Sequence, residues 1–243
     1  MFTSQKKNKI ILTFDLEFWY DTEFLKEYLP ESRQDCLVES VLPVLNLLKK
    51  YNAQATFFTT GKVMEKYPEL IKQIHSQGHE IASHGYSHEF LGKLAKEKFV
   101  EEMKKCVELT EKTIGEKPKG FRAPCFSLNK KTSWALLILA ELGFKYHSGR
   151  SSMPGSALLE VPAGYSGGVY FRLLPVFFFK YLLKKQRILY LHPHELYKDT
   201  PIIERAPGFK KFLKYYRVKD SLNKLEKLLQ SFQFGSVEQV LGL

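Results

Sequence analysis

The chain has 243 residues, 44% of them hydrophobic and 26% charged, which is typical of a folded domain and excludes a disordered chain. Its three cysteines, an odd number without metal-type spacing, argue against a disulfide framework and for a reducing compartment. The net charge is +11, and residues 180–227, with 13 basic against 5 acidic side chains, carry +8 of it. Such a patch attracts nucleic acid, an anionic membrane or a phosphate-bearing substrate, unless it is only a solvated face.

Short β-rich segments alternate with helical patterns along the chain. The predicted strands are residues 9–15, 53–59, 80–83, 119–122, 144–147 and 187–192, with compact apolar runs typical of strands buried on both faces. The predicted helices contain Val41, Leu42, Leu45 and Leu48, with Pro43 in the first turn; Ile71 and Ile74, ended by Gly78; residues 92–114 and 130–142; and Leu222, Leu225, Leu229 and Phe232. This alternation predicts a mainly parallel α/β sheet, open or closed into a barrel, in a single domain over residues 1–243.

No segment has the features of a signal peptide or a membrane span. The apolar run before Asp15 is about five residues long, and the stretch LLPVFFFKYLL has about half the length needed to cross a bilayer. We therefore expect a cytoplasmic protein, with peripheral contact between the basic C-terminal region and the inner membrane as an open alternative.

Reactive side chains stand where the predicted strands end, the edge at which parallel α/β folds gather their chemistry. They are Asp15 and Glu17 after the first strand, His84 and His88 after the third, Arg122 at the fourth and His192 at the last. His84 and His88 have the spacing of one helix face. Two imidazoles and a carboxylate with open positions form a catalytic metal site, and a second carboxylate and a further histidine can serve as base and acid.

Five motifs in order resemble the polysaccharide deacetylases, the NodB homology domain of carbohydrate esterase family four. They are TFDLE, SHGYSH, FRAPCF, YHSG and YLHPHEL, supported by ATFFTTG and GHEIASH. The resemblance covers residues 1–195, with the catalytic motifs in 9–195, and leaves 196–243 as a basic helical region. It implies a distorted (β/α) barrel and hydrolysis of an N-acetyl group from an amino sugar. GYSGGVYFRLLP and the tail resemble a subgroup found with bacterial exopolysaccharide and O-antigen biosynthesis.

The resemblance also assigns roles to the residues at the strand ends. Asp15 would be the general base, His84 and His88 would hold a divalent metal, most often zinc, and Arg122 would orient the base. His192 would be the general acid that protonates the departing amine. The metal and a backbone N–H would stabilise the oxyanion.

Two residues depart from the family pattern. Leu16 stands where the common motif has a metal-binding Asp, so we expect Glu17 to be the third ligand, because alternate residues of a strand share a face. The alternative places Glu17 outside the ligand set. His147 stands where the family usually has an Asp that pairs with the arginine, and Arg122 is then expected to pair directly with Asp15 or Glu17.

Further residues near the motifs are expected to contact the substrate. They are Trp19, Pro124, Phe126, Gly167, Gly168, Arg172 and Glu195. Core packing is the alternative for Trp19, a plain turn for the two glycines and a loop position for Glu195.

The leading hypothesis is a metal-dependent N-deacetylase that acts on a glycan precursor, nucleotide-linked or lipid-linked, whose phosphates would be attracted to the basic tail. One alternative is a catalytically degenerate member that binds glycan or membrane, motivated by Leu16 and His147. A second is an iron oxygenase, because two His and one carboxylate also form that site. No nucleic-acid-binding module is recognisable, so we expect no nucleic-acid partner; the sugar, the acyl group, the native metal and the oligomeric state stay open.

Overall fold

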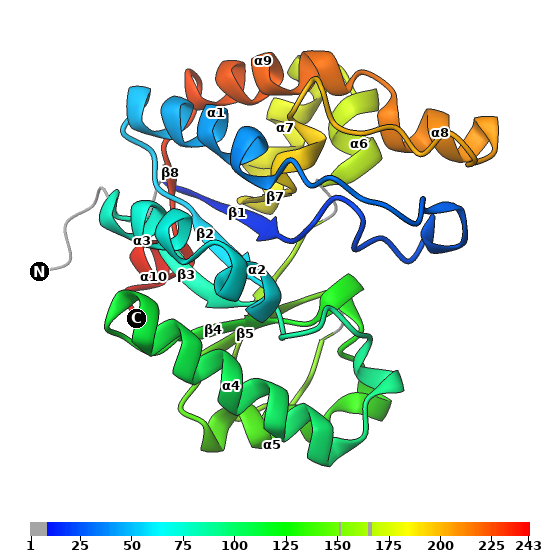
Figure 1. Cartoon of the computed structure of the whole chain (residues 1–243). Coiled ribbons are helices and arrows are strands. Elements are labelled where there is room, and N and C mark those ends of the chain that lie inside the picture. The colour runs from blue at the N-terminus through cyan, green and yellow to red at the C-terminus, as the bar shows by residue number, and fades with distance from the viewer. Residues whose placement is uncertain (1–8, 151, 165–166) are drawn as a thin grey trace, which may run out of the picture. The chain divides into compact units, whose positions relative to one another are not determined.

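The computed structural model describes residues 9–150, 152–164 and 167–243 (Figure 1). The start of the N-terminal stretch and Tyr165 and Ser166 of the motif GYSGGVYFRLLP lie outside the described residues. The chain divides into two compact units, and each contains its own parallel strands. The described parts of residues 1–55 and 164–240 form the terminal unit, and residues 56–163 with 241–243 form the central unit.

The terminal unit is built around β1 (Ile10–Leu16), in which every residue is buried. β7 (Ile188–Leu191) pairs with β1 in parallel, with Phe14 opposite Leu191, and β8 (Phe234–Gly235) also pairs in parallel with β1. The other elements of this unit are α1 (Leu37–Lys50), α6 (Gly168–Leu173), α7 (Val176–Gln186), α8 (Gly208–Tyr215), α9 (Val218–Leu229), α10 (Val237–Leu241) and the 3-10 helices η2 (Lys26–Tyr28) and η6 (Pro193–Glu195). Because β1 and β7 are parallel neighbours, the residues that follow them emerge at the same edge.

The central unit contains five parallel strands in the order β2, β3, β4, β5, β6. Their bounds are β2 (Thr56–Thr59), β3 (Glu80–Ser83), β4 (Gly120–Arg122), β5 (Tyr146–Gly149) and β6 (Leu159–Pro162). The helices are α2 (Gly61–Lys66), α3 (Pro68–Ser76), α4 (Lys96–Ile114), α5 (Trp134–Glu141), η3 (Leu91–Lys93), η4 (Pro124–Phe126) and η5 (Lys130–Thr132). The loops that leave β3 and β4 carry the predicted motifs of this unit.

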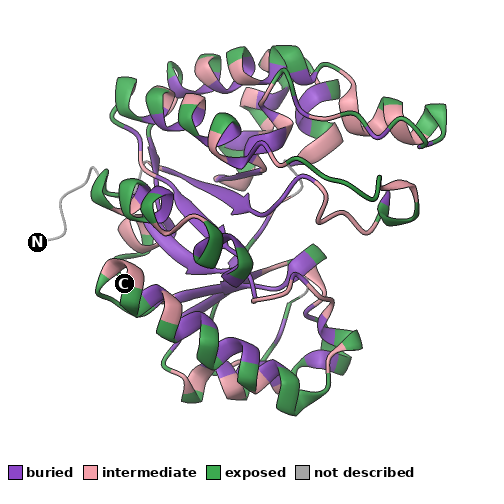
Figure 2. Cartoon of the chain, viewed as in Figure 1, coloured by how far each residue is buried: buried purple, intermediate pink, exposed green. Residues whose placement is uncertain are grey.

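The core of the central unit joins α4 and α5 to β4. Phe99 and Met103 of α4 lie one turn apart on its buried face, as the helical repeat requires. The Phe99 ring packs edge-on against Phe121 of β4, with 6.0 Å between ring centroids, and against Trp134 of α5. Figure 2 shows the same division along α4, with buried residues on one face and exposed ones on the other. This packing fixes β4, and with it the position of Arg122.

The predicted strands all exist in the structure. Residues 80–83 have the predicted bounds, and 144–147 begins two residues late, as β5. The sequence reading missed β6, which lies at the edge of its sheet and has only one buried residue, Val161, and it missed β8, which has only two residues. It also missed α2 and α6, which are only six residues long, and α7, whose apolar residues follow no clear polar–apolar repeat. Helices α8 and α10 lie in residues 196–243, which it expected to be helical without placing the individual helices.

The placement of Pro43 in a first helical turn was wrong. Helix α1 begins at Leu37, and Pro43 is its seventh residue. The buried stripe extends back through Val41, Ser40 and Leu37, so burial starts the helix early, despite the hydrogen bond that Pro43 cannot donate.

The structure also bears on the expectations about disulfides and membrane-spanning helices. All three cysteines are free thiols, in line with the absence of a disulfide framework. Within the described ranges, we find no helix with the length and apolar character needed to cross a membrane.

Candidate active site

Three of the predicted site residues lie together in the terminal unit. Asp15 is the penultimate residue of β1, Glu17 follows β1, and His192 follows β7. The Nε2 atom of His192 lies 3.9 Å from a carboxylate oxygen of Asp15 and 3.6 Å from one of Glu17. Both carboxylates are buried, at 3% and 8% exposure. A carboxylate and an imidazole so placed can exchange protons with a group bound beside them.

A second carboxylate holds the other side of the His192 ring. The Nδ1 atom of His192 lies 3.1 Å from Oε2 of Glu195, and Oε1 of Glu195 lies 3.0 Å from Nη1 of Arg172. Burial opposes the charge on His192, but the carboxylates of Glu195, Glu17 and Asp15 outweigh it and raise the pKa of His192 to about 9. Burial also opposes the charge on Glu195, and the neighbouring His192 and Arg172 outweigh it and lower its pKa.

Glu195 and Arg172 therefore have partners on the protein itself. Both oxygens of Glu195 are engaged, and Nη2 of Arg172 donates to the Leu213 carbonyl. In the structure both residues support His192, and the substrate contact that the sequence suggested for them stays a prediction. The signal was readable in HPHE, because residues three apart can meet when the chain turns after a strand.

The other expected substrate contacts of this unit have packing partners. Trp19 is buried beside Leu25 and Ile203, and its Nε1 donates to the Gln34 carbonyl, which favours the core-packing alternative. A side chain at Gly167 would collide with the Tyr190 ring, since its Cβ would lie 2.1 Å from that ring. Gly168 has φ +60°, a conformation that favours glycine. Contact of these residues with substrate stays a prediction.

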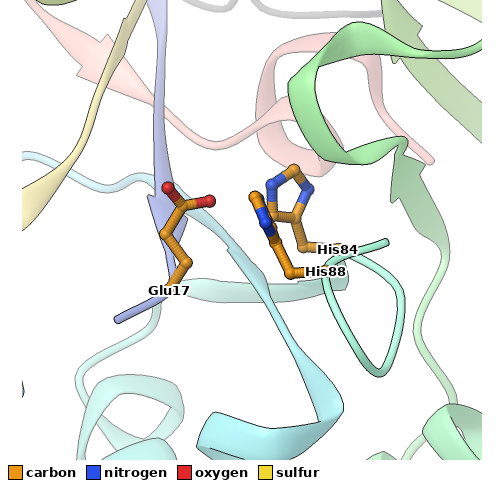
Figure 3. A group of neighbouring side chains, drawn as sticks. All are labelled: Glu17, His84 and His88. Carbon is orange, nitrogen blue, oxygen red and sulfur yellow. The ribbon is translucent and has the colours of Figure 1, made fainter. Parts of the chain in front are cut away.

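The central unit contributes the two histidines of SHGYSH. Figure 3 shows both rings on the segment that follows β3, and the Glu17 carboxylate just after β1. The segment is not a helix: Gly85 and His88 have φ +74° and +62°, and this turn brings the two rings to 5.2 Å between centroids. The helical-face reading of the four-residue spacing was wrong, because the two positive φ angles bend the chain instead.

The two imidazoles suit a metal ion. Both side chains are buried, and a ring nitrogen of each lies within 4.8 Å of the other. Nδ1 of His84 lies 2.8 Å from the Arg122 carbonyl, which can only accept, so Nδ1 carries the proton. That tautomer leaves the lone pair of Nε2 free of the proton, the arrangement found in metal-binding histidines.

Arg122, the last residue of β4, is fully buried. Its Nη2 atom donates to the Ser148 hydroxyl at 3.0 Å, and its guanidinium lies 4.0 Å from the centroid of the Phe58 ring. The hydroxyl of Ser148, next to His147 in β5, thus stands beside Arg122 within this unit. The predicted pairing of Arg122 with Asp15 or Glu17 stays a prediction.

His147 turns toward β6 instead. Its Nε2 atom lies 3.8 Å from Oε1 of Glu160, which stands opposite it in the β5–β6 register. Burial lowers the pKa of His147, while Glu160 raises it by less. Both ring nitrogens are buried without a hydrogen-bond partner among the described residues. This histidine lines a pocket of about 280 Å³ together with Arg150 and Glu160.

The loop after β4 is strained. Pro124 is buried, while the next two residues, Cys125 and Phe126, have φ +50° and +54°, which non-glycine residues rarely adopt. The Arg150 guanidinium lies 4.3 Å from the centroid of the Phe126 ring. Such strain costs about 1–3 kcal/mol a residue and gathers at ligand-binding loops. A substrate contact by Pro124 or Phe126 stays a prediction.

Comparison with known proteins agrees with the motifs. The family model described as Polysaccharide deacetylase matches residues 3–147, and a domain of unknown function (DUF3473) matches residues 152–242. A peptidoglycan-N-acetylglucosamine deacetylase of Bacillus cereus is 36% identical over 93 residues, 38% of this chain and 34% of that protein. A peptidoglycan deacetylase of Helicobacter pylori is 37% identical over 103 residues, 42% of this chain and 34% of that protein. The chain thus spans about a third of the length of these relatives.

Solved structures show the fold. The peptidoglycan deacetylase PdaC of Bacillus subtilis aligns over 99% of this chain and 93% of its own, with a TM-score of 0.61 and 17% identity. A CE4 family pseudoenzyme of Bacillus anthracis aligns over 97% of this chain and 66% of its own, with a TM-score of 0.59 and 15% identity. The fold class expected from the sequence, the mainly parallel α/β fold of the deacetylase type, is confirmed. With the family match over more than half of its length, the chain belongs to the polysaccharide deacetylase family.

Proposed function

We propose that the chain is a metal-dependent N-deacetylase that removes an acetyl group from an amino sugar and releases acetate. The observation that carries this proposal is the pairing of Asp15 and His192 at neighbouring strand ends, in a chain of this family. The names of the relatives from Bacillus cereus and Helicobacter pylori support the same reaction class.

In this proposal Asp15 removes the proton from the attacking water, and His192 gives a proton to the departing amine. The two groups lie 3.9 Å apart at the same end of neighbouring strands, so both can reach one bound amide and its attacking water. Glu195 keeps the imidazole turned with Nε2 toward Asp15, and Arg172 holds Glu195. Arg122 orients the base.

The metal would be held by His84, His88 and Glu17, with zinc as the expected ion. When bound, it supplies a Lewis acid that acidifies water and polarises the acyl oxygen. The tautomer of His84 supports the histidine pair. Glu17 is supported by its place two residues after Asp15, because Leu16 cannot bind a metal.

For the substrate, we propose a glycan precursor of the exopolysaccharide or O-antigen type, carried in the cytoplasm on a nucleotide or lipid diphosphate. The basic region between residues 180 and 227 supports an anionic carrier. Three lysines of α8 within this region have partners in the chain. Lys210 pairs with Glu27, Lys211 with Glu204, and Lys214 donates to the Trp19 carbonyl, so the surplus charge lies elsewhere in this region.

Acetate release tests the proposal. The full chain, loaded with zinc, is given N-acetylglucosamine oligomers, a UDP-linked N-acetylhexosamine and a polyprenyl-diphosphate-linked one. We expect release from at least one diphosphate-linked sugar and little from the free oligomers. Acetate release from the free oligomers alone would refute the proposed nucleotide or lipid carrier. Stoichiometric metal without acetate release from any of these sugars would favour the alternative of a catalytically degenerate family member that only binds glycan or membrane.

A further inference from the structure

Helices α6 and α7 expose an aromatic surface that the proposed chemistry does not use. Of the fourteen large apolar residues that are exposed in the described chain, five fall between residues 170 and 181: Tyr170, Leu173, Phe177, Phe178 and Tyr181. Phe177 is 76% exposed and Tyr181 52%. A soluble helix normally turns such side chains inward, so a cluster of this kind marks a binding surface.

The orientation of α7 is set by its opposite face. Phe179 and Leu183 are its buried residues, and Phe179 packs edge-on against Phe171 of α6, with 5.3 Å between ring centroids. Phe178 and Tyr181 then lie side by side on the outside of the helix, with 6.4 Å between their ring centroids. The outward aromatic face is therefore a consequence of a well-packed inner face and not of a loosely attached helix.

Lysines continue this surface toward the end of α7. Lys184 and Lys185 are exposed, and the Nζ atom of Lys185 lies 4.7 Å from the centroid of the Tyr181 ring. Among the described residues, neither lysine has a carboxylate partner. Exposed aromatic rings beside unpaired lysines fit the boundary of an anionic bilayer, where rings enter the headgroup layer and lysines meet lipid phosphates.

A basic pocket opens beside the start of α7. It has a volume of about 370 Å³, and its walls include Leu174, Pro175 and Val176 on one side and Arg217, Lys224 and Lys227 of α9 and its cap on the other. Arg172 also lines it, 4% exposed, and its Nε atom has no hydrogen-bond partner among the described residues.

The charge of this pocket is not balanced within the chain. Asp220 pairs with Arg217, but Lys224 donates to the Phe171 and Leu174 carbonyls and, in the described chain, has no carboxylate partner. Burial, together with Arg217, lowers the pKa of Lys224 to about 8. Lys227 likewise lacks a carboxylate partner among the described residues. A buried cation without a counter-charge is stabilised when an anion enters.

We propose that the aromatic surface of α6 and α7 docks on an anionic phospholipid bilayer, with the adjoining basic pocket receiving a lipid phosphate. The surface supplies apolar area, Lys184 and Lys185 supply attraction to the membrane charge, and the pocket supplies the specific phosphate contact. This differs from the contact expected in residues 196–243, because its apolar part lies in residues 170–181. It does not depend on the deacetylase activity.

Vesicle flotation with the full chain tests the apolar part of the proposal. Vesicles of phosphatidylcholine with about a third phosphatidylglycerol are compared with vesicles of phosphatidylcholine alone. We expect binding to the first only, and the double variant Phe177→Ser, Tyr181→Ser lowers the partition coefficient by about tenfold or more. The control Leu137→Ser removes an equally exposed residue of α5 and leaves binding unchanged.

Matched charge variants separate a defined surface from the general attraction of a +11 protein. Lys184→Gln with Lys185→Gln is expected to weaken binding by about fivefold per lysine. Lys104→Gln with Lys112→Gln, two exposed lysines of α4, removes the same charge and has a smaller effect. Equal losses in both pairs, or full binding by the double aromatic variant, would overturn the proposal.

The pocket has its own test. Lys227→Gln changes an exposed side chain, and Lys224→Met removes the buried charge; both are expected to weaken vesicle binding, while the fold is checked by circular dichroism. A melting-temperature shift with inorganic pyrophosphate, without any vesicle binding, would mean a site for a soluble phosphate instead. Loss of a concentration-dependent dimer in the double aromatic variant, again without vesicle binding, would mean that the surface joins two copies of the chain.

Discussion

The strand ends and helices α6 and α7 both depart from the rule that polar side chains face the solvent and apolar side chains are buried, but in opposite directions. At the strand ends, polar side chains are buried: Arg122, His84 and Asp15 are at most 3% exposed. On α6 and α7, aromatic side chains face the solvent. Both departures cost free energy in the isolated chain. Each cost is offset if a ligand binds there: a polar ligand at the buried polar side chains, and an apolar one at the exposed aromatic rings. In the functions proposed above, the buried polar side chains act on a metal and an amide, and the aromatic surface binds a lipid.

The largest expected effect concerns the histidine pair. His84→Ala or His88→Ala removes a nitrogen ligand, so we expect bound zinc to be lost and acetate release to fall by more than about a hundredfold. Treatment of the wild type with a chelator should have the same effect, reversed by added zinc. Metal content is measured by mass spectrometry of the purified protein.

His75→Ala is the control, because this histidine lies on α3 and pairs with Glu116. It should keep both metal and activity. Full metal occupancy in both His84→Ala and His88→Ala would contradict the assignment of these residues as ligands.

Two neighbouring phenylalanines of α7 sharpen the comparison of buried and exposed rings. Phe179→Ala opens a cavity beside Phe171 and should lower the free energy of unfolding by about 3–5 kcal/mol. Phe177→Ala removes only an exposed ring and should change it by less than about 0.5 kcal/mol. Urea denaturation measures both, and equal losses would show that Phe177 is a core residue.

A smaller effect is expected at Glu195, which contacts His192 from the side opposite Asp15. Glu195→Ala should lower kcat by about ten- to a hundredfold and leave KM unchanged, because the imidazole is no longer held. Glu195→Gln keeps an oxygen that accepts from Nδ1 and should recover part of the rate. Steady-state acetate release distinguishes the two, and a rise in KM with constant kcat would indicate that Glu195 contacts the substrate instead.

The sequence predicted the strand ends well because their signals are local. EIAS, for example, places the apolar pair Ile81 and Ala82 between Gly78 and a polar segment, and it forms β3 with the predicted bounds. His192 and Asp15 lie far apart in the sequence, and their contact follows from the order of the strands, which a family resemblance implies but a single segment does not contain.

Other features of the structure have no local signal in the sequence. In VFFFKYLLKK, apolar residues occur on every side of the helix, so the pattern does not reveal that Phe179 is buried and Phe177 exposed. The edge strand β6 carries Glu160 and Pro162, residues that disfavour a strand, and its contact with His147 depends on pairing with β5. The turn of His88 also required the structure, because a positive φ at histidine is uncommon.

The most direct test of the proposed deacetylase is a comparison of the wild type with Asp15→Asn. Asp15 is assigned as the base and not as a ligand, so the variant should bind as much zinc as the wild type. Its acetate release should fall by about a hundredfold or more. Equal acetate release by the two proteins would contradict the assignment of Asp15, and no release by the zinc-loaded wild type from any acetylated sugar would contradict the enzyme itself.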